Sequence, residues 1–171
     1  MKISIRQATP ADSYAILKYT KKILDETPYM ISTSKEYLNS IEDEEFWTRQ
    51  TYEDGGIILL AFSGRSLVGL LSVNRHRRIR KRHTCSFGIS VKKSHHGKGI
   101  GSLLMNEMIS WAEKQPGLEK INLEVFSNNI IARRLYQKLG FREEGRLLKD
   151  IKYVDGTYAD LINMGMFLKK D

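Results

Sequence analysis

The 171-residue chain has one cysteine, three prolines and no long apolar run. The single cysteine, Cys85, excludes an intramolecular disulfide and is typical of a protein kept in a reducing cytoplasm. None of the apolar runs approaches the ~20 residues that a membrane-spanning helix needs. The alternating start of the chain also lacks the apolar stretch of a signal peptide. We therefore expect one cytoplasmic domain over residues 1–171, with no membrane partner.

Acidic residues are scarce in one segment only. The formal net charge is +8, and residues 75–83 contain six Lys or Arg and no Asp or Glu. Of the 28 basic residues, the 22 outside this segment nearly balance the 20 acidic ones. The segment fits a solvated hairpin tip, an arm for nucleic acid or an arm for an acidic protein. Because it has no aromatic side chain on which a base could stack, nucleic acid is not expected as a partner.

Strand-like and helix-like spacings of apolar residues alternate along the chain. Strands are predicted at residues 2–8, 57–62, 67–74, 85–91, 121–126, 146–154 and 157–168. Helices are predicted from Thr9 or Asp12 to Leu24, and over residues 34–52, 98–114 and 129–139. Asp155-Gly156 fits a tight turn between the last two strands. This order predicts an α/β (α+β) fold, with helices packed on one mixed sheet.

The most informative stretch is His96-Gly97-Lys98-Gly99-Ile100-Gly101, between a predicted strand and a predicted helix. Its alternating glycines let the backbone approach a ligand closely. The first turn of the helix adds N–H groups that no helical carbonyl accepts from, at the positive end of the helix dipole. This arrangement is typical of a phosphate site. The glycine spacing matches neither the dinucleotide fingerprint nor the P-loop.

A second cluster follows, with Asn129, Ala132, Leu135-Tyr136 and then Leu139-Gly140-Phe141. From Ser86 to Phe141 the chain resembles the GCN5-related N-acetyltransferase (GNAT) superfamily. That family's acetyl-CoA loop reads Arg/Gln-x-x-Gly-x-Gly/Ala after a strand that ends in Val. Here the strand ends at Val91, and His96 stands where Arg or Gln is usual. The resemblance implies a GNAT fold, with a mostly antiparallel sheet of about seven strands and about four helices, and acetyl-CoA as co-substrate.

The resemblance also implies which residues contact acetyl-CoA. The backbone of the strand that ends at Val91 should bind the pantetheine arm like an added strand, and the glycine loop should hold the pyrophosphate. The implied contacts are Ile89, Val91, His96, Gly97, Lys98, Gly99, Ile100, Gly101, Ser102, Asn129, Ala132 and Tyr136. No metal is expected, because no Cys or carboxylate lies at ligand spacing from His95-His96.

Two side chains are candidates for the proton transfers of acetyl transfer. Glu124 would be the general base, since an amine arrives partly or mostly protonated and must lose a proton. It lies twelve residues before Tyr136, as the base does in the family's ribosomal-protein N-terminal acetyltransferases. Tyr136 would be the general acid toward the coenzyme A sulfur. Each has a structural alternative: Glu124 as a solvated strand residue, and Tyr136 as a core aromatic within an apolar stripe of Ile131, Leu135 and Leu139.

Cys85 is a further candidate, as an acetyl-accepting nucleophile in a two-step route. It alternates with apolar strand residues, so a buried structural thiol is expected instead.

The resemblance predicts direct transfer of an acetyl group from acetyl-CoA to a primary amine in a ternary complex. We expect a small-molecule acceptor, such as an amino acid, a polyamine or an aminoglycoside. The alternatives are a protein N-terminal acetyltransferase and a non-catalytic module that binds acetyl-CoA or RNA. The resemblance also implies that the acceptor lies between the loop after the first helix, at Glu26–Met30, and the last hairpin, at Tyr153–Tyr158. A homodimer is a possible assembly. Side chains there that suit a cationic amine are Glu26, Tyr29, Tyr153, Asp155 and Asp160.

Overall fold

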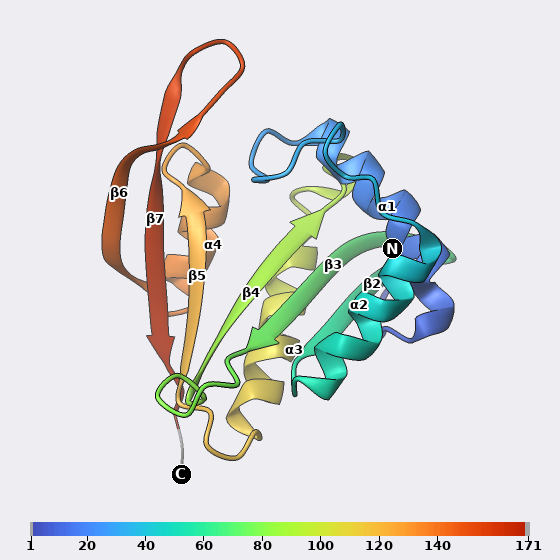
Figure 1. Cartoon of the computed structure of the whole chain (residues 1–171), viewed down its shortest axis with the longest axis horizontal. Helices are drawn as coiled ribbons and strands as arrows, with labels where there is room; N and C mark the ends of the chain where they lie inside the picture. Colours follow the sequence, from blue (N-terminus) through green and yellow to red (C-terminus); the bar gives the residue numbers. More distant parts are fainter. Residues whose placement is uncertain (1, 170–171) are drawn as a thin grey trace.

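Seven β-strands form one mixed sheet in the computed structural model, which describes residues 2–169 (Figure 1). Along the sheet the strands are ordered β1-β2-β3-β4-β5-β7-β6, and only the β4–β5 pair is parallel. The strands are β1 Ile3–Gln7, β2 Ile57–Ser63, β3 Ser66–Arg75, β4 Thr84–Val91, β5 Lys120–Phe126, β6 Arg142–Lys152 and β7 Tyr158–Phe167. The expected mixed, mostly antiparallel sheet is confirmed.

Four α-helices in residues 2–169 cover the two faces of the sheet (Figure 1). They are α1 Ser13–Glu26, α2 Ile41–Glu53, α3 Ile100–Glu113 and α4 Ile130–Lys138, with short 3₁₀ turns at Pro10–Asp12 and Lys93–His95. Helices α1 and α2 lie on one face, which we call the front, and α3 and α4 lie on the back. None of these helices has the length and apolar character required to cross a bilayer.

Each face of the sheet has its own core. On the front, Ile16 and Ile23 of α1 pack with Ile58 and Leu60 of β2. On the back, the larger core joins α3 and α4 to the odd-numbered residues of β4 and β5: Cys85, Phe87, Ile121, Leu123 and Val125. Because side chains alternate between faces along a strand, the even-numbered residues of β4 and β5 face the front.

The second helix begins at Ile41, and the prediction that it begins at Ser34 was wrong. Ser40 is its N-cap: the Ser40 hydroxyl accepts from the Asp43 N–H at 3.1 Å, and the Asp43 carboxylate accepts from the Ser40 N–H at 2.8 Å. Thr33 and Glu36 form only one isolated turn before it. Residues 27–40 are therefore a long connection that leads away from the end of α1.

Other bounds differ by a few residues. Helix α3 begins at Ile100 rather than residue 98, because Gly99 has a left-handed backbone. Strand β6 begins at Arg142 rather than residue 146, since Arg142 pairs with Gly165 of β7. The Asp155-Gly156 turn is confirmed by the Tyr153 N–H, which donates to the Thr157 carbonyl at 2.9 Å. The basic segment at residues 75–83 joins antiparallel β3 and β4, as expected for a hairpin tip.

Strands β4 and β5 separate soon after they meet. Their pairing covers Thr84–Ser86 on β4 and Lys120–Asn122 on β5, and then the two strands diverge (Figure 1). We call the unpaired stretches beyond this point, Phe87–Val91 and Leu123–Phe126, the fork. The fork leaves one edge of β4 without a strand partner in the middle of the sheet.

Gly56, between α2 and β2, gives a direct test of the packing. A Cβ there would lie 2.1 Å from the Val73 carbonyl oxygen and 3.0 Å from that of Thr51. Since backbone atoms cannot move aside cheaply, Gly56→Ala is expected to destabilise the protein by roughly 1–3 kcal/mol. Gly145→Ala is the matched control, because a Cβ there meets nothing within 4 Å. Thermal unfolding should show a lower Tm for the first variant only, and equal Tm values would contradict this packing.

Candidate active site

The free edge of β4 can bind an extended ligand through its backbone. The Lys92 N–H donates to the Val68 carbonyl at 2.9 Å, so Lys92 turns its backbone groups toward β3. Since these groups alternate in direction along an antiparallel strand, Ile89 and Val91 turn theirs toward the fork. Their predicted role along the pantetheine arm is compatible with this orientation. From Val91 back to Phe87 the edge runs about 13 Å, so a ligand along it must be extended.

The glycine loop continues directly from this edge into α3. Gly97 and Gly99 have φ values of +73° and +75°, a left-handed conformation that favours glycine. The first helical bond of α3 runs from the Leu103 N–H to the Gly99 carbonyl at 3.0 Å. Between these points a run of backbone N–H groups has no acceptor within residues 2–169. The run comprises Gly97, Lys98, Gly99, Ile100, Gly101 and Ser102. It is a cradle for an anion at a helix N-terminus.

Cations surround this cradle. The Lys98 ammonium donates to the Ser94 carbonyl at 3.1 Å and stays exposed. Loss of hydration lowers the pKa of His95 below its ordinary value, and the charges of Lys98 and Lys92 lower it further. Burial likewise lowers the pKa of Lys92, with Lys22 adding to the effect. The positive field of Lys98 and Lys92 suits a pyrophosphate.

His96 braces the loop against the strand. Its Nε2 lies 2.8 Å from the Val91 carbonyl oxygen, so the ring closes the loop back onto the end of β4. This hydrogen bond occupies the Val91 carbonyl on the fork side and leaves the Val91 N–H free. His96, which stands where the family usually has Arg or Gln, therefore connects the glycine loop to β4.

Asn129 and Ala132 lie at the start of α4. The Asn129 side-chain oxygen accepts from the Ala132 N–H at 3.3 Å, which makes Asn129 the helix N-cap. Helices α3 and α4 pack closely at Gly101, because a Cβ on this residue would lie 3.2 Å from Leu135 Cδ2.

Tyr136 of α4 sits beside the narrow end of the fork. Its ring makes edge contacts with Phe87 and Phe141, at centroid distances of 5.9 and 6.1 Å. Phe87 is the first β4 residue beyond the stretch paired with β5. Burial raises the pKa of Tyr136 to about 12. The Tyr136 hydroxyl has no hydrogen-bond partner in residues 2–169. Every fully buried side-chain N or O atom in those residues does have a partner. The Tyr136 oxygen is therefore not fully buried and can contact a bound group.

The prediction of an apolar stripe around Tyr136 was right for Leu135 and Leu139 and wrong for Ile131. Leu135 and Leu139 pack against the back core, but Ile131 is 80% exposed. Helix α4 turns Ile131 outward, and the two phenylalanines fill the space next to the ring instead. Phe87 comes from β4 and Phe141 from the connection between α4 and β6, so helical spacing alone does not find them.

Glu124 lies on β5, two residues past its last pairing with β4. Its even-numbered position faces the front, opposite the side where Leu123 and Val125 join the back core. Asn163 of β7 is its cross-strand neighbour. The exposed Glu124 carboxylate has no hydrogen bond or ion pair with the part of the chain from 2 to 169.

Glu124 and Tyr136 therefore lie on opposite faces of the sheet, both close to the narrow end of the fork. A group bound between the strands would meet a carboxylate from the front and a phenol from the back. This arrangement can accept a proton on one side and donate a hydrogen bond on the other. Cys85 lies before the fork, fully buried, and burial raises the pKa of its thiol to about 12, which suits a structural thiol rather than a nucleophile.

All three acids predicted to lie near the acceptor have partners within the protein. The Asp155 carboxylate accepts from the Thr157 N–H at 2.9 Å, and that of Asp160 pairs with Arg146 at 3.0 Å. The Glu26 carboxylate accepts from the Lys93 N–H at 3.0 Å. These contacts orient the carboxylates within turns and loops, and Asp160 is also paired with a cation.

Two side chains near the fork, Tyr19 and Asn163, were not among the residues predicted from the sequence. Tyr19 of α1 donates to the Ser90 carbonyl at 2.8 Å and so holds the front face against β4. Tyr153, which sequence analysis placed near the acceptor, lies with its hydroxyl within 3.2 Å of both amide atoms of Asn128, and its ring contacts Phe126. Tyr29 remains 38% exposed. Only Asn163 had a sequence signal, as a polar residue inside the apolar run of residues 161–166.

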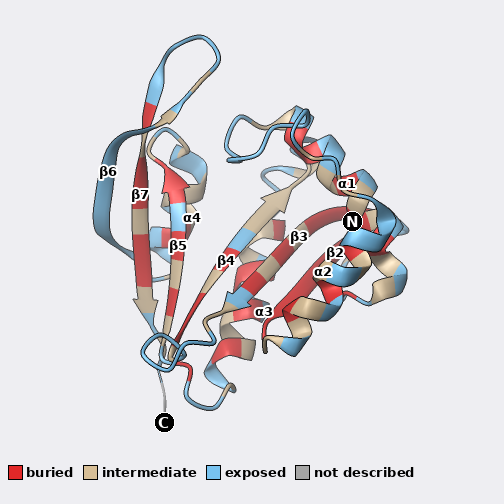
Figure 2. Cartoon of the chain, viewed as in Figure 1, coloured by how far each residue is buried: buried red, intermediate tan, exposed pale blue. Residues whose placement is uncertain are grey.

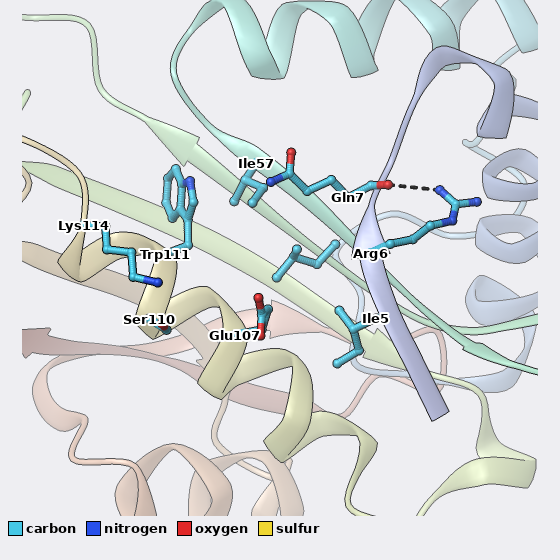
Figure 3. Close-up of a pocket in the computed structure, with 9 residues that line it drawn as sticks. Ile5, Arg6, Gln7, Ile57, Glu107, Ser110, Trp111 and Lys114 are labelled. Atoms are coloured by element: carbon cyan, nitrogen blue, oxygen red, sulfur yellow. Dashed lines mark hydrogen bonds between the residues drawn. The ribbon is translucent and has the colours of Figure 1, made fainter. Parts of the chain in front are cut away.

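A hollow of about 330 Å³ lies elsewhere, between β1, β2 and α3 (Figure 3). Its lining includes Gln7, Glu107, Trp111 and Lys114, and the Arg6 side chain turns away to donate to the Gln7 carbonyl at 3.0 Å. None of the predicted site residues lines it. No three His, Cys, Asp or Glu side chains from residues 2–169 gather into a cluster that could hold a metal ion.

Comparisons with known proteins show the family to which the chain is similar. A family model described as "Acetyltransferase (GNAT) family" matches residues 24–141. The L-amino acid N-acetyltransferase AaaT of Escherichia coli (strain K12) is 31% identical over 131 residues, which cover 71% of this chain and 81% of that protein. The spermidine N(1)-acetyltransferase of Vibrio cholerae is 30% identical over 106 residues, covering 62% of this chain and 60% of that enzyme.

A solved structure extends the similarity to nearly the whole chain. It is an acetyltransferase of the GNAT family from Streptococcus pneumoniae, 29% identical, with a TM-score of 0.92. The match covers 98% of this chain and 100% of that one.

Proposed function

This chain belongs to the acetyltransferase (GNAT) family and is an acetyl-CoA-dependent N-acetyltransferase, and we propose that its acceptor is a small molecule of the amino-acid type. The unpartnered carboxylate of Glu124, at the fork and across the sheet from Tyr136, is the observation that carries this proposal. The glycine loop would hold the pyrophosphate, and the backbone of Ile89 and Val91 would bind the pantetheine arm.

Glu124 would act first, as the general base. An α-amine has a pKa of about 8, so most of it is protonated at neutral pH. From the front face the Glu124 carboxylate accepts one amine proton, directly or through one water, and so frees the lone pair. Bound acetyl-CoA supplies the acetyl group through its thioester: the C–N bond forms as the C–S bond breaks.

Tyr136 would act on the other side, toward the leaving sulfur. With its pKa raised to about 12, the phenol remains protonated at neutral pH. A thiol has a pKa near 8.5, so full proton transfer from this phenol to a thiolate is unfavourable at equilibrium. Tyr136 therefore donates a hydrogen bond to the sulfur as negative charge develops, and solvent supplies the final proton.

Tyr136→Phe tests this role. A hydrogen bond to a charged group contributes about 1.5–3 kcal/mol, so kcat is expected to fall about 10- to 100-fold. The ring contacts with Phe87 and Phe141 remain, so stability should not fall. Tyr14→Phe is the control, because Tyr14 is 58% exposed on α1. Steady-state kinetics that give equal kcat values for both variants would exclude the proposed hydrogen bond.

The charge near the acceptor supports an amino-acid type of substrate over a polyamine. A polyamine carries several cations and needs several free carboxylates. Here Asp155, Asp160 and Glu26 are held by protein partners, whereas Glu124 is not. The similarity to an L-amino acid N-acetyltransferase agrees with this preference.

A thiol-release assay with acetyl-CoA tests the proposal. The panel contains L-amino acids, spermidine, aminoglycosides and peptides with free N-termini. We expect release with one or more amino acids and at least tenfold lower kcat/KM with spermidine. A preference for spermidine would overturn the acceptor assignment. A preference for peptides would instead favour a protein N-terminal acetyltransferase, for which the spacing of Glu124 and Tyr136 is also typical.

A further inference from the structure

Residues 75–83, here called the basic arm, lie at the closed end of the fork: the His83 carbonyl accepts from the N–H of Lys120, four β5 residues (about 13 Å) before Glu124. The arm joins β3 to β4 directly before Thr84, where β4 and β5 are paired. The fork opens toward the other end of β4, where the glycine loop begins (Figure 1). A partner bound to the arm would therefore leave the open end of the fork and the glycine loop accessible.

The arm is folded and attached to its surroundings. The Lys81 N–H donates to the Arg78 carbonyl at 2.8 Å, and the Thr84 N–H donates to the Lys81 carbonyl at 2.9 Å. The His83 carbonyl accepts from the N–H groups of Glu119 and Lys120, at 2.8 and 3.1 Å. The backbone is thus held by the protein itself, so a ligand would have to order mainly the Arg and Lys side chains.

Most cations of the arm have no counter-charge. Arg77 pairs with Asp54 at 3.0 Å, and the Arg75 guanidinium turns toward the Arg82 carbonyl. The loop between β3 and β4 is largely exposed (Figure 2). Four of its exposed cations have no acidic partner in residues 2–169: Arg78, Arg80, Lys81 and Arg82. Clustered unpaired charges repel one another, and an anionic partner would reduce this electrostatic repulsion.

We propose that the basic arm binds double-stranded nucleic acid through its phosphates. Five of its six cations are arginines, and a planar guanidinium group can donate two parallel hydrogen bonds to two phosphate oxygens. Missing aromatic side chains disfavour single strands, which bind by base stacking, but a duplex is held through its backbone and needs no stacking. A duplex also has a high density of negative charge, about one phosphate charge per 1.7 Å of its axis. This density suits the arm, which has four unpaired cations within five residues. This proposal replaces the expectation that nucleic acid is not a partner.

Fluorescence anisotropy with a 20-base-pair RNA duplex and a DNA duplex of the same sequence tests the proposal. With about four phosphate contacts, the log–log slope of affinity against salt should be about −3 to −4, and affinity should fall about 100-fold between 50 and 200 mM salt. Tighter binding of one duplex identifies whether RNA or DNA is the preferred source of the phosphates.

The decisive variant replaces Arg78, Arg80, Lys81 and Arg82 with alanine. The control replaces four exposed cations outside the arm, Lys21, Lys35, Arg65 and Lys138, and changes the net charge equally. We expect the arm variant to lose about 100-fold in duplex affinity at 50 mM salt, the control to lose less than threefold, and both to keep the wild-type acetyl-transfer rate. Arg80→Ala alone should reduce the salt slope by about one, should the fourfold variant fail to fold.

Three results would overturn the proposal. One is no duplex binding at 50 mM salt. Another is equal loss in the arm variant and the control, which would show a net-charge effect only. The third is tighter arm-dependent binding to single strands, to anionic vesicles or to an acidic protein than to either duplex.

Discussion

Replacing Glu124 with glutamine is expected to lower kcat about 100- to 10,000-fold at pH 7, the range of a lost general base. Glutamine keeps the size and the exposed front-face position of the side chain but cannot take a proton. The KM for acetyl-CoA should remain unchanged, because Glu124 lies across the sheet from the cradle of backbone N–H groups. Raising the pH should partly restore the rate, since more of the amine is then deprotonated without help.

Glu119→Gln is the matched control for this experiment. Glu119 directly precedes β5 and is exposed, its side chain has no partner in residues 2–169, and it lies at the end of β5 away from the fork. Steady-state kinetics should give this variant the wild-type kcat. If Glu124→Gln kept the wild-type kcat at pH 7, the base would lie elsewhere or water would suffice.

Replacing Gly99 with valine is expected to weaken acetyl-CoA binding about 10- to 100-fold. A β-branched residue strongly disfavours the φ of +75° at this position, so the loop would rearrange and turn N–H groups away from the phosphates. Each lost hydrogen bond to a charged phosphate contributes about 1.5–3 kcal/mol, and 1.4 kcal/mol is tenfold in affinity. Isothermal titration calorimetry measures the change in Kd directly.

Gly117→Val separates this effect from general backbone strain. Gly117 has a φ of +71° in the turn after α3, and a Cβ there meets nothing within 4 Å, as at Gly99. Both variants should lose a similar amount of stability, about 1–2 kcal/mol. Only Gly99→Val should lose acetyl-CoA affinity, and an equal loss in both would contradict the cradle.

The glycine loop and the class of fold could be predicted from sequence because both depend on local patterns. Alternating glycines before an apolar helix set a left-handed turn and a free helix N-terminus in the same few residues. Strand alternation also placed Glu124 opposite Leu123 and Val125. Such features need no knowledge of which elements meet in space.

The surroundings of the reacting groups could not be predicted in this way. Phe87 and Phe141 approach Tyr136 from two strand-side segments, and Asn163 meets Glu124 through the β5–β7 register. The acids of the last hairpin looked available in sequence, but the structure pairs Asp160 with Arg146 and caps a turn with Asp155. These contacts depend on register and hairpin geometry, which a single sequence does not specify.

A crystal structure with coenzyme A and the preferred amine bound would test the central claim most directly. We predict that the sulfur lies within about 3–3.5 Å of the Tyr136 oxygen and that the acceptor nitrogen approaches from the Glu124 side. The pantetheine arm should follow the β4 edge at Ile89 and Val91. Coenzyme A in the hollow beside Trp111, or an acceptor nitrogen on the Tyr136 side of the sheet, would contradict this account.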